Sequence, residues 1–203
     1  MGLLVAGFNF SPVAEDEFND WYDTEHIPER ERVKGFVNCE RWIGAEDPKI
    51  SIATYDLESL AVLQTPAYRA IAGANLSPWS KRVTGKCRRI CRFEAEQTLP
   101  GNQAAPASGA TAMLFFAMNP VPEAEADFNA WYNEEHVPAL AAVPGCLTAK
   151  DAKPRRKNVW EFELEDTQKI EKVPLYAGPF PDRREVMIQC GLVSLLCFFD
   201  FEF

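Results

Sequence analysis

The chain has 203 residues, of which 47% are hydrophobic and 12% are aromatic, and its formal net charge is −9 at pH 7. This apolar content is enough for a folded core and excludes a disordered chain, while the acidic balance argues against nucleic acid or an anionic membrane as partner. The start of the chain lacks signal-peptide features and no apolar run reaches transmembrane length, so a soluble cytoplasmic protein is expected.

Residues 1–97 predict the order strand, helix, strand, strand, helix, strand. The first strand is expected at Leu3–Phe10, and a helix follows from Ser11-Pro12, where serine can cap and proline suits the first turn. This helix should reach about His26 and be disturbed at Pro28, because proline lacks an amide donor. The remaining strands are expected at Phe36–Trp42, Lys49–Leu57 and Cys87–Glu96, and a second helix at Glu58–Ala72.

A segment rich in Pro, Gly, Ala and Ser, Thr98–Gly109, follows this unit and is predicted to be a linker. Residues 110–203 repeat the same order of elements, so the expected organisation is two domains, 1–97 and 110–203, joined by 98–109. In the second domain, strands are expected at Thr111–Met118, Gly145–Lys150, Asn158–Leu164 and Leu192–Phe203, and helices at Glu123–His136 and near Thr167–Val173.

The two halves share an internal repeat with an offset of 110 residues. The segment FNDWYDTEHIP, Phe18–Pro28, recurs as FNAWYNEEHVP, Phe128–Pro138. The only two histidines of the chain, His26 and His136, occupy equivalent positions in these segments. A repeat of this length implies one structural unit present in tandem.

Each βαββαβ unit would have a sheet with helices on one face, so its other face must be covered. The second unit is the obvious cover, which predicts an eight-stranded pseudo-dimeric barrel. The signature F-N-x-W-Y-x-x-E-H-x-P, followed by V-x-G and a strand, resembles the EthD-like family of the dimeric α+β barrel superfamily. The resemblance covers both halves. It implies an α+β fold of two tandem ferredoxin-like units, as a monomer (a pseudo-dimer) or a homodimer.

The resemblance also implies a range of activities, which include polyketide cyclisation, lactone isomerisation, cofactor-free oxygenation, decarboxylation and haem breakdown. The fold alone does not select among them. The sequence contains no GxGxxG, P-loop, HExxH or GxSxG motif, which disfavours nucleotide, flavin and common metal sites. Metal-free acid–base chemistry without a cofactor is therefore favoured, with haem or no chemistry as the alternatives.

Helical spacing places the repeated aromatic, acidic and histidine side chains on one face of the helix. Burying a carboxylate and an imidazole against a sheet costs several kcal/mol unless they are paired or line a cavity. An imidazole with a carboxylate and aromatic walls nearby suits acid–base chemistry on an apolar, enolisable substrate. The candidate catalytic residues are His26, Tyr22, Glu25, His136, Tyr132 and Glu135, and the candidate substrate-binding residues are Trp21, Tyr55, Tyr68, Trp79 and Trp131.

A purely structural interpretation of the same residues is open. The aromatic side chains of the motif can form the core, His26 can satisfy carbonyls at a helix end, and Glu25 can point into water. The two copies also differ. The first keeps a segment, Ala70–Ser80, that could floor or gate a pocket, whereas the second ends in a phenylalanine-rich strand, Leu195–Phe203, which predicts a smaller second cavity.

Three functions remain open from the sequence. The first is a cofactor-independent lyase, isomerase or cyclase that acts on a small aromatic or polyketide-like substrate, with a histidine as general acid–base and a tyrosine hydrogen-bonding an enolate oxygen. The second is a cofactor-free monooxygenase of the same fold. The third is a non-enzymatic binding protein for a hydrophobic small molecule.

Overall fold

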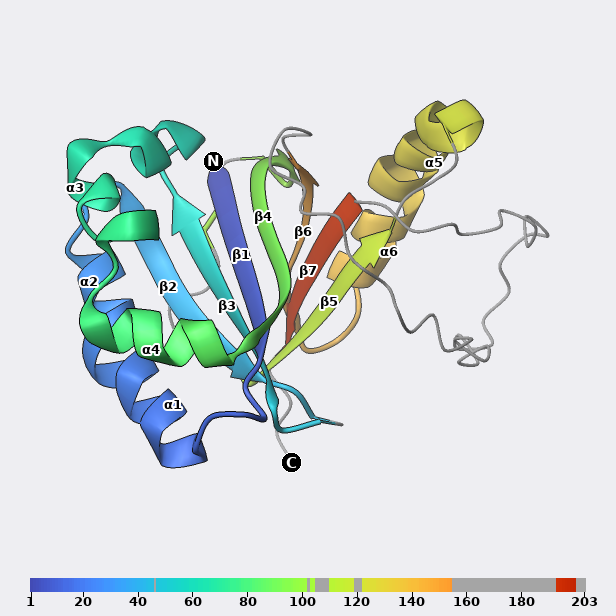
Figure 1. Ribbon diagram of the computed structural model, residues 1–203. Coiled ribbons are helices and arrows are strands. Elements are labelled where there is room, and N and C mark those ends of the chain that lie inside the picture. The colour runs from blue at the N-terminus through green and yellow to red at the C-terminus, as the bar shows by residue number, and fades with distance from the viewer. Residues whose placement is uncertain (46, 102, 105–109, 119–121, 155–192, 200–203) are drawn as a thin grey trace.

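The computed structural model describes residues 1–45, 47–101, 103–104, 110–118, 122–154 and 193–199. This part of the chain has an α+β fold, as the sequence predicts. Seven strands form one curled, antiparallel sheet in the order β2-β3-β1-β4-β6-β7-β5 (Figure 1). Helices α1 to α4 lie along the outer side of the first four strands, and α5 and α6 lie beside the strands of the second half (Figure 1).

The first four strands follow the predicted order closely. They are β1 (Gly2–Asn9), β2 (Phe36–Ile43), β3 (Ile50–Leu57) and β4 (Arg88–Leu99). Strands β1 and β3 lie in the middle of this half of the sheet and are largely buried, which suits the nearly continuous apolar sequence of β1. Strand β4 continues to Leu99, two residues into the segment predicted to be the linker.

The first helix does not stop near His26. It consists of α1 (Glu15–Trp21), a π-helical turn η1 (Tyr22–His26) and α2 (Ile27–Glu31), so it continues through Pro28. In the π turn the Ile27 amide donates to the Tyr22 carbonyl, five residues back. Pro28 then falls in the first turn of α2, where a missing amide donor costs little. Pro28 is therefore accommodated after a wider π turn, and it does not end the helix.

The prediction of one helix at Glu58–Ala72 was wrong. That stretch forms a 3₁₀ turn η2 (Leu60–Gln64), a short α3 (Pro66–Arg69) and, after it, η3 (Gly73–Asn75). A helix that the sequence analysis missed, α4 (Pro78–Lys86), packs against α1 instead. Proline breaks the run and starts both helices, and Ser77 caps α4 by accepting from the Ser80 amide at 2.9 Å.

The described part of the second half repeats the strand–helix–strand arrangement. Its elements are β5 (Ala112–Met118), η4 (Pro122–Ala124), α5 (Glu125–Trp131), η5 (Tyr132–His136), α6 (Val137–Ala141) and β6 (Cys146–Pro154), followed much later by β7 (Val193–Phe199). The π turn recurs at the same place as in the first half. The predicted strand Asn158–Leu164 and the predicted helix near Thr167–Val173 lie outside the described residues.

Strand β7 of the second half does not occupy the position that the repeat predicts. Phe199 pairs with both Ala112 and Cys146, just as Leu57 of β3 pairs with their counterparts 110 residues earlier. Strand β7 therefore takes the place of β3, whereas its sequence position in the repeat corresponds to β4. Its run of apolar residues, VSLLCFF, suits a strand with neighbours on both sides.

Strands β4 and β6 join the two halves into one sheet, with Ala95 opposite Pro154 and Leu99 opposite Asp151. A second core lies on the sheet face away from α1 to α4. It contains residues of both halves, among them Val5, Phe93 and Ala152. No helix in the described part is long and apolar enough to cross a membrane.

Candidate functional site

The repeated motif gathers its aromatic and histidine side chains into one cluster at the π turn of the first half. The His26 ring centroid lies 4.5 Å from that of Trp21 and 5.1 Å from that of Tyr22. Trp21 and Tyr22 are completely buried between the helix and the sheet, and His26 is half-buried. We call His26, Trp21, Tyr22 and Tyr55 the first-half cluster.

The imidazole of His26 is a neutral base in this environment. Its Nδ1 atom is enclosed and has no hydrogen-bond partner among the described residues. Burial lowers the pKa of His26 well below the usual value of 6.5, and the nearby Arg30 guanidinium lowers it further. The helix continues past this residue, so His26 does not satisfy carbonyls at a helix end. A neutral imidazole with an unengaged nitrogen is able to accept a proton.

Two phenols belong to the first-half cluster: Tyr22, whose ring contacts the imidazole, and Tyr55, whose hydroxyl lies beside that of Tyr22. The hydroxyls of Tyr22 and Tyr55 are buried, and neither makes a well-formed hydrogen bond within the described part of the chain. Burial raises the pKa of Tyr22, against the opposing effects of Arg41 and of the adjacent Tyr55 hydroxyl. Burial also raises the pKa of Tyr55. Both phenols are therefore protonated near neutral pH and are available as hydrogen-bond donors.

Glu25 connects the π turn to α4. Its Oε1 atom accepts hydrogen bonds from the Ser77 hydroxyl at 2.5 Å and from the Ser80 hydroxyl at 2.9 Å. Ser80 in turn accepts from the Trp21 indole at 2.9 Å. These bonds fix the carboxylate and the tryptophan ring, so Glu25 holds the cluster in place. The Ser77-Pro78 pair that begins α4 is the sequence signal that could have identified these two serines.

The other predicted binding residues of the first half line the same core. Tyr68 is buried, stacks near Phe36 with ring centroids 5.9 Å apart, and accepts a long hydrogen bond of 3.4 Å from Arg92. Trp79 packs against this core, and its indole nitrogen is enclosed without a partner among the described residues. Sequence reasoning also missed the buried Arg30, whose guanidinium donates to the Ile71 carbonyl at 3.1 Å.

The second copy has a looser version of the cluster. The His136 ring stacks on Trp131 at 4.8 Å and lies 5.1 Å from the buried ring of Tyr132. Burial lowers the pKa of His136 too. Glu135, however, is exposed. The phenylalanines that were predicted to fill this half, Phe199 with Phe201 and Phe203, have side chains outside the described set.

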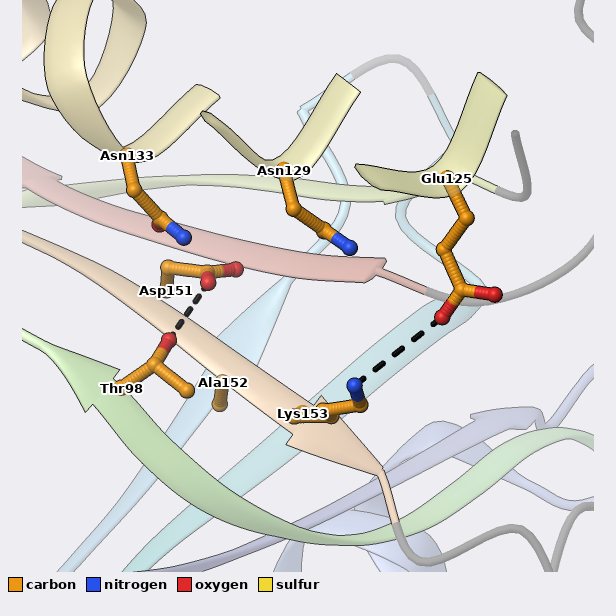
Figure 2. Close-up of a pocket in the computed structure, with 7 residues that line it drawn as sticks. All are labelled: Thr98, Glu125, Asn129, Asn133, Asp151, Ala152 and Lys153. Atoms are coloured by element: carbon orange, nitrogen blue, oxygen red, sulfur yellow. Dashed lines mark hydrogen bonds and ion pairs between the residues drawn. The ribbon is translucent and has the colours of Figure 1, made fainter. Parts of the chain in front are cut away.

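Two cavities stand out in the described part of the chain, and neither is lined by a predicted site residue. One, of about 190 Å³, lies between β6 and the helix formed by α5 and η5 (Figure 2). The other, of about 170 Å³, lies at the start of β1 beside Glu58 and Glu96. In the first-half cluster, the rings of Trp21, Tyr22 and His26 pack against one another.

Comparisons with known proteins add no identification. The chain matches no family model, and it has no significant match among curated proteins. Among the described residues, no group of three or more His, Cys, Asp or Glu side chains is arranged to hold a metal ion.

Proposed function

We propose that the protein is a cofactor-independent lyase, isomerase or cyclase, in which His26 transfers a proton of a small aromatic or polyketide-like substrate. One observation carries this proposal: a neutral, half-buried imidazole with an unengaged Nδ1 atom contacts the ring of Tyr22, and the buried hydroxyls of Tyr22 and the adjacent Tyr55 make no well-formed hydrogen bond in the described structure. Buried polar atoms are nearly always satisfied in folded proteins, so a group of them in one core favours a bound ligand or bound water.

The chemistry follows from the protonation states. A neutral His26 would take a proton from carbon next to a carbonyl or phenolic group, and the Tyr22 hydroxyl would donate a hydrogen bond to the oxygen that gains negative charge. The Tyr22 hydroxyl is enclosed by protein atoms, and a low local dielectric strengthens such a hydrogen bond. Glu25 would act as a positioning residue, because its carboxylate is already engaged by Ser77 and Ser80.

We further propose that the chain belongs to the EthD-like type and folds as a tandem pseudo-dimeric barrel. The order β2-β3-β1-β4 agrees with a ferredoxin-like βαββαβ unit, and the pairing of β4 with β6 supports an arrangement in which each half covers the other. The placement of β7 would then be a departure of the second half from the first. A chain of this kind would not need a partner to cover its sheet, so light scattering should give a monomer or a homodimer of pseudo-dimers.

Proton transfer is testable without knowledge of the product. Small aromatic ketones, hydroquinones and unsaturated lactones are incubated with the protein in D₂O, and deuterium incorporation at enolisable positions is followed by NMR. We expect catalysed exchange for at least one compound, reduced about 10²–10⁴-fold in His26→Gln. Tyr22→Phe should also slow the exchange.

The same experiment separates the alternatives. Oxygen consumption with an activated phenol, dependent on His26, would indicate the monooxygenase. Compounds that bind without exchange or turnover would indicate a binding protein. Exchange that is unchanged in His26→Gln would contradict the proposed role of the imidazole.

A further inference from the structure

The side chain of Arg41 fills a polar site between β2 and α1 in the first half. Its Nη1 atom donates to Asn19 Oδ1 at 2.7 Å, and its Nη2 atom donates to the two carboxylate oxygens of Asp23 at 3.0 and 3.2 Å. The guanidinium also lies over the Tyr22 ring, 5.2 Å from its centroid. One planar cation thus binds both the Asn19 amide oxygen and the Asp23 carboxylate, whose side chain is 60% exposed.

The second half has a carboxylate at the position of this guanidinium. At the offset of 110 residues, Asn129, Asn133 and Asp151 replace Asn19, Asp23 and Arg41. The structural register supports this alignment, because β2 and β6 have a pairing irregularity at equivalent positions, just after their first residues. The cation of the first half is therefore absent from the second, and a shorter, acidic side chain stands in its place.

The cavity of about 190 Å³ occupies this same site. Figure 2 shows the side chains of Asn129 and Asn133, from the helix, and of Asp151, from β6, directed into one space. Asp151 is 4% exposed, and its Oδ2 atom accepts a hydrogen bond from the Thr98 hydroxyl. At the rim, Glu125 and the exposed Lys153 form an ion pair of 3.9 Å.

Two acceptors in this cavity have no donor among the described residues. They are Asp151 Oδ1 and Asn133 Oδ1, and both atoms are enclosed. A buried carboxylate oxygen without a donor is costly, and burial accordingly raises the pKa of Asp151. A ligand that supplied several N–H donors and a positive charge would satisfy both acceptors and stabilise the charged form of Asp151.

We propose that this cavity binds the guanidinium group of a small molecule, in the place that the Arg41 guanidinium takes in the first half. The planar fork of N–H donors matches the acceptors Asp151 Oδ1 and Asn133 Oδ1, as it matches Asn19 and Asp23 in the first half. Pockets for drug-sized ligands have roughly 300–1,000 Å³. This smaller cavity suits the cationic end of a ligand or a short guanidine. The site is separate from the first-half cluster, so it does not depend on the proposed catalytic function.

The test uses the full-length protein and methylguanidinium chloride as the probe. Backbone and side-chain amide signals are followed by two-dimensional NMR at constant ionic strength, with methylammonium chloride, sodium chloride and calcium chloride as comparisons. We expect saturable shifts centred on Asn129, Asn133 and Asp151 with methylguanidinium, and weaker or no shifts with methylammonium. Absence of saturation, equal shifts with methylammonium, or a selective response to calcium would overturn the proposal.

Variants locate the site. The near-isosteric change Asp151→Asn should weaken methylguanidinium binding at least about tenfold, and Asn133→Ala provides an independent variant if Asp151→Asn does not fold. Glu58→Gln, a carboxylate change at the other cavity, should leave binding unchanged. The double change Asp151→Arg with Asn133→Asp rebuilds the first-half arrangement and should abolish binding. Unaltered affinity in these cavity variants would contradict the assignment.

Discussion

Lys150 Nζ lies 2.8 Å from Asp56 Oδ1, and the two side chains are only 1% and 6% exposed. This ion pair connects β6 of the second half with β3 of the first, 94 residues apart in the chain. Burial lowers the pKa of Lys150, while the adjacent Asp56 and Glu40 carboxylates raise it again. The stability of the packing between the two halves should therefore depend on both Lys150 and Asp56.

Removal of one member of this pair should be strongly destabilising. Lys150→Met leaves the Asp56 carboxylate buried without the ammonium group, and the free energy of unfolding should fall by about 3–5 kcal/mol. The double variant Lys150→Met with Asp56→Asn should be more stable than Lys150→Met alone. Urea unfolding gives both values. The exposed Lys49–Glu15 pair is the matched control, and Lys49→Met should cost less than about 1 kcal/mol; similar losses at the two lysines would contradict a buried pair.

The hydroxyl of Ser80 should contribute measurably to stability. It donates to the half-buried Glu25 and accepts from the buried Trp21, so Ser80→Ala removes one hydrogen-bond partner from each of these side chains. We expect a loss of about 1–3 kcal/mol in thermal or urea unfolding. Thr24→Ala, which removes an exposed hydroxyl bonded to the Asp20 carbonyl, is the control and should be nearly neutral. An unchanged free energy of unfolding in Ser80→Ala would show that these hydrogen bonds do not hold α4 against the π turn.

The lowered pKa of His26 predicts acid sensitivity. The unfolded state has an ordinary histidine pKa near 6.5 and binds a proton before the folded state does, so stability is retained above about pH 7 and falls as the pH drops below 6.5. Between pH 7.5 and 5.5 the wild type should lose about 1 kcal/mol more than His26→Gln. His136 shifts in the same direction but is present in both proteins and cancels. If stability depended on pH in the same way in both proteins, the pKa of His26 would not be lowered by burial, which would contradict this environment of the imidazole.

The thiols of the half-buried Cys39 and Cys87 and of the buried Cys91 should react slowly. Burial raises the pKa of Cys39 and Cys91 to about 12 and that of Cys87 to about 11, so little thiolate is present at pH 8. Alkylation with iodoacetamide, followed residue by residue with mass spectrometry, should be at least about tenfold slower in the native protein than in urea. Equal rates in the two states would contradict the packing around these strands.

Much of the first half could be predicted from the sequence. The strands are alternating or largely apolar runs, and the turn at Gly35 is a local signal. The helix start predicted at Ser11-Pro12 was wrong, because these residues form a turn and α1 begins at Glu15 after Ala14. Gly35 has a φ of +101°, a conformation that favours glycine, and Gly145 repeats it. Such features depend on neighbouring residues alone, which is why a single sequence shows them.

The features that the sequence did not predict depend on contacts between distant residues or on small energy differences. The π turn that carries the helix through Pro28 replaces one hydrogen-bond pattern by another of similar energy. Ala70–Ser80 was interpreted only as a segment that could floor or gate a pocket, so helix α4 was overlooked, although Ser77-Pro78 is a helix start. The place of β7 beside β6 is a long-range pairing that strand sequences do not specify.

The candidate site was found only in part. The repeat identified the histidine, tryptophan and tyrosine that contact one another, because their spacing fixes them on one helix. The serines that hold Glu25 and the guanidinium of Arg30 come from other positions along the chain, and nothing in the motif indicates them. Arg41 and Asp151, one a cation and one a carboxylate at equivalent positions, gain meaning only once the structure shows what each faces.

The central claim is that the first-half cluster performs proton transfer through His26. The most direct measurement compares deuterium exchange of a responsive substrate in wild type, His26→Gln and His136→Gln. We expect a loss of about 10²–10⁴-fold for His26→Gln and less than about tenfold for His136→Gln, with both variants folded. Equal losses in the two variants, or full activity in His26→Gln, would contradict it.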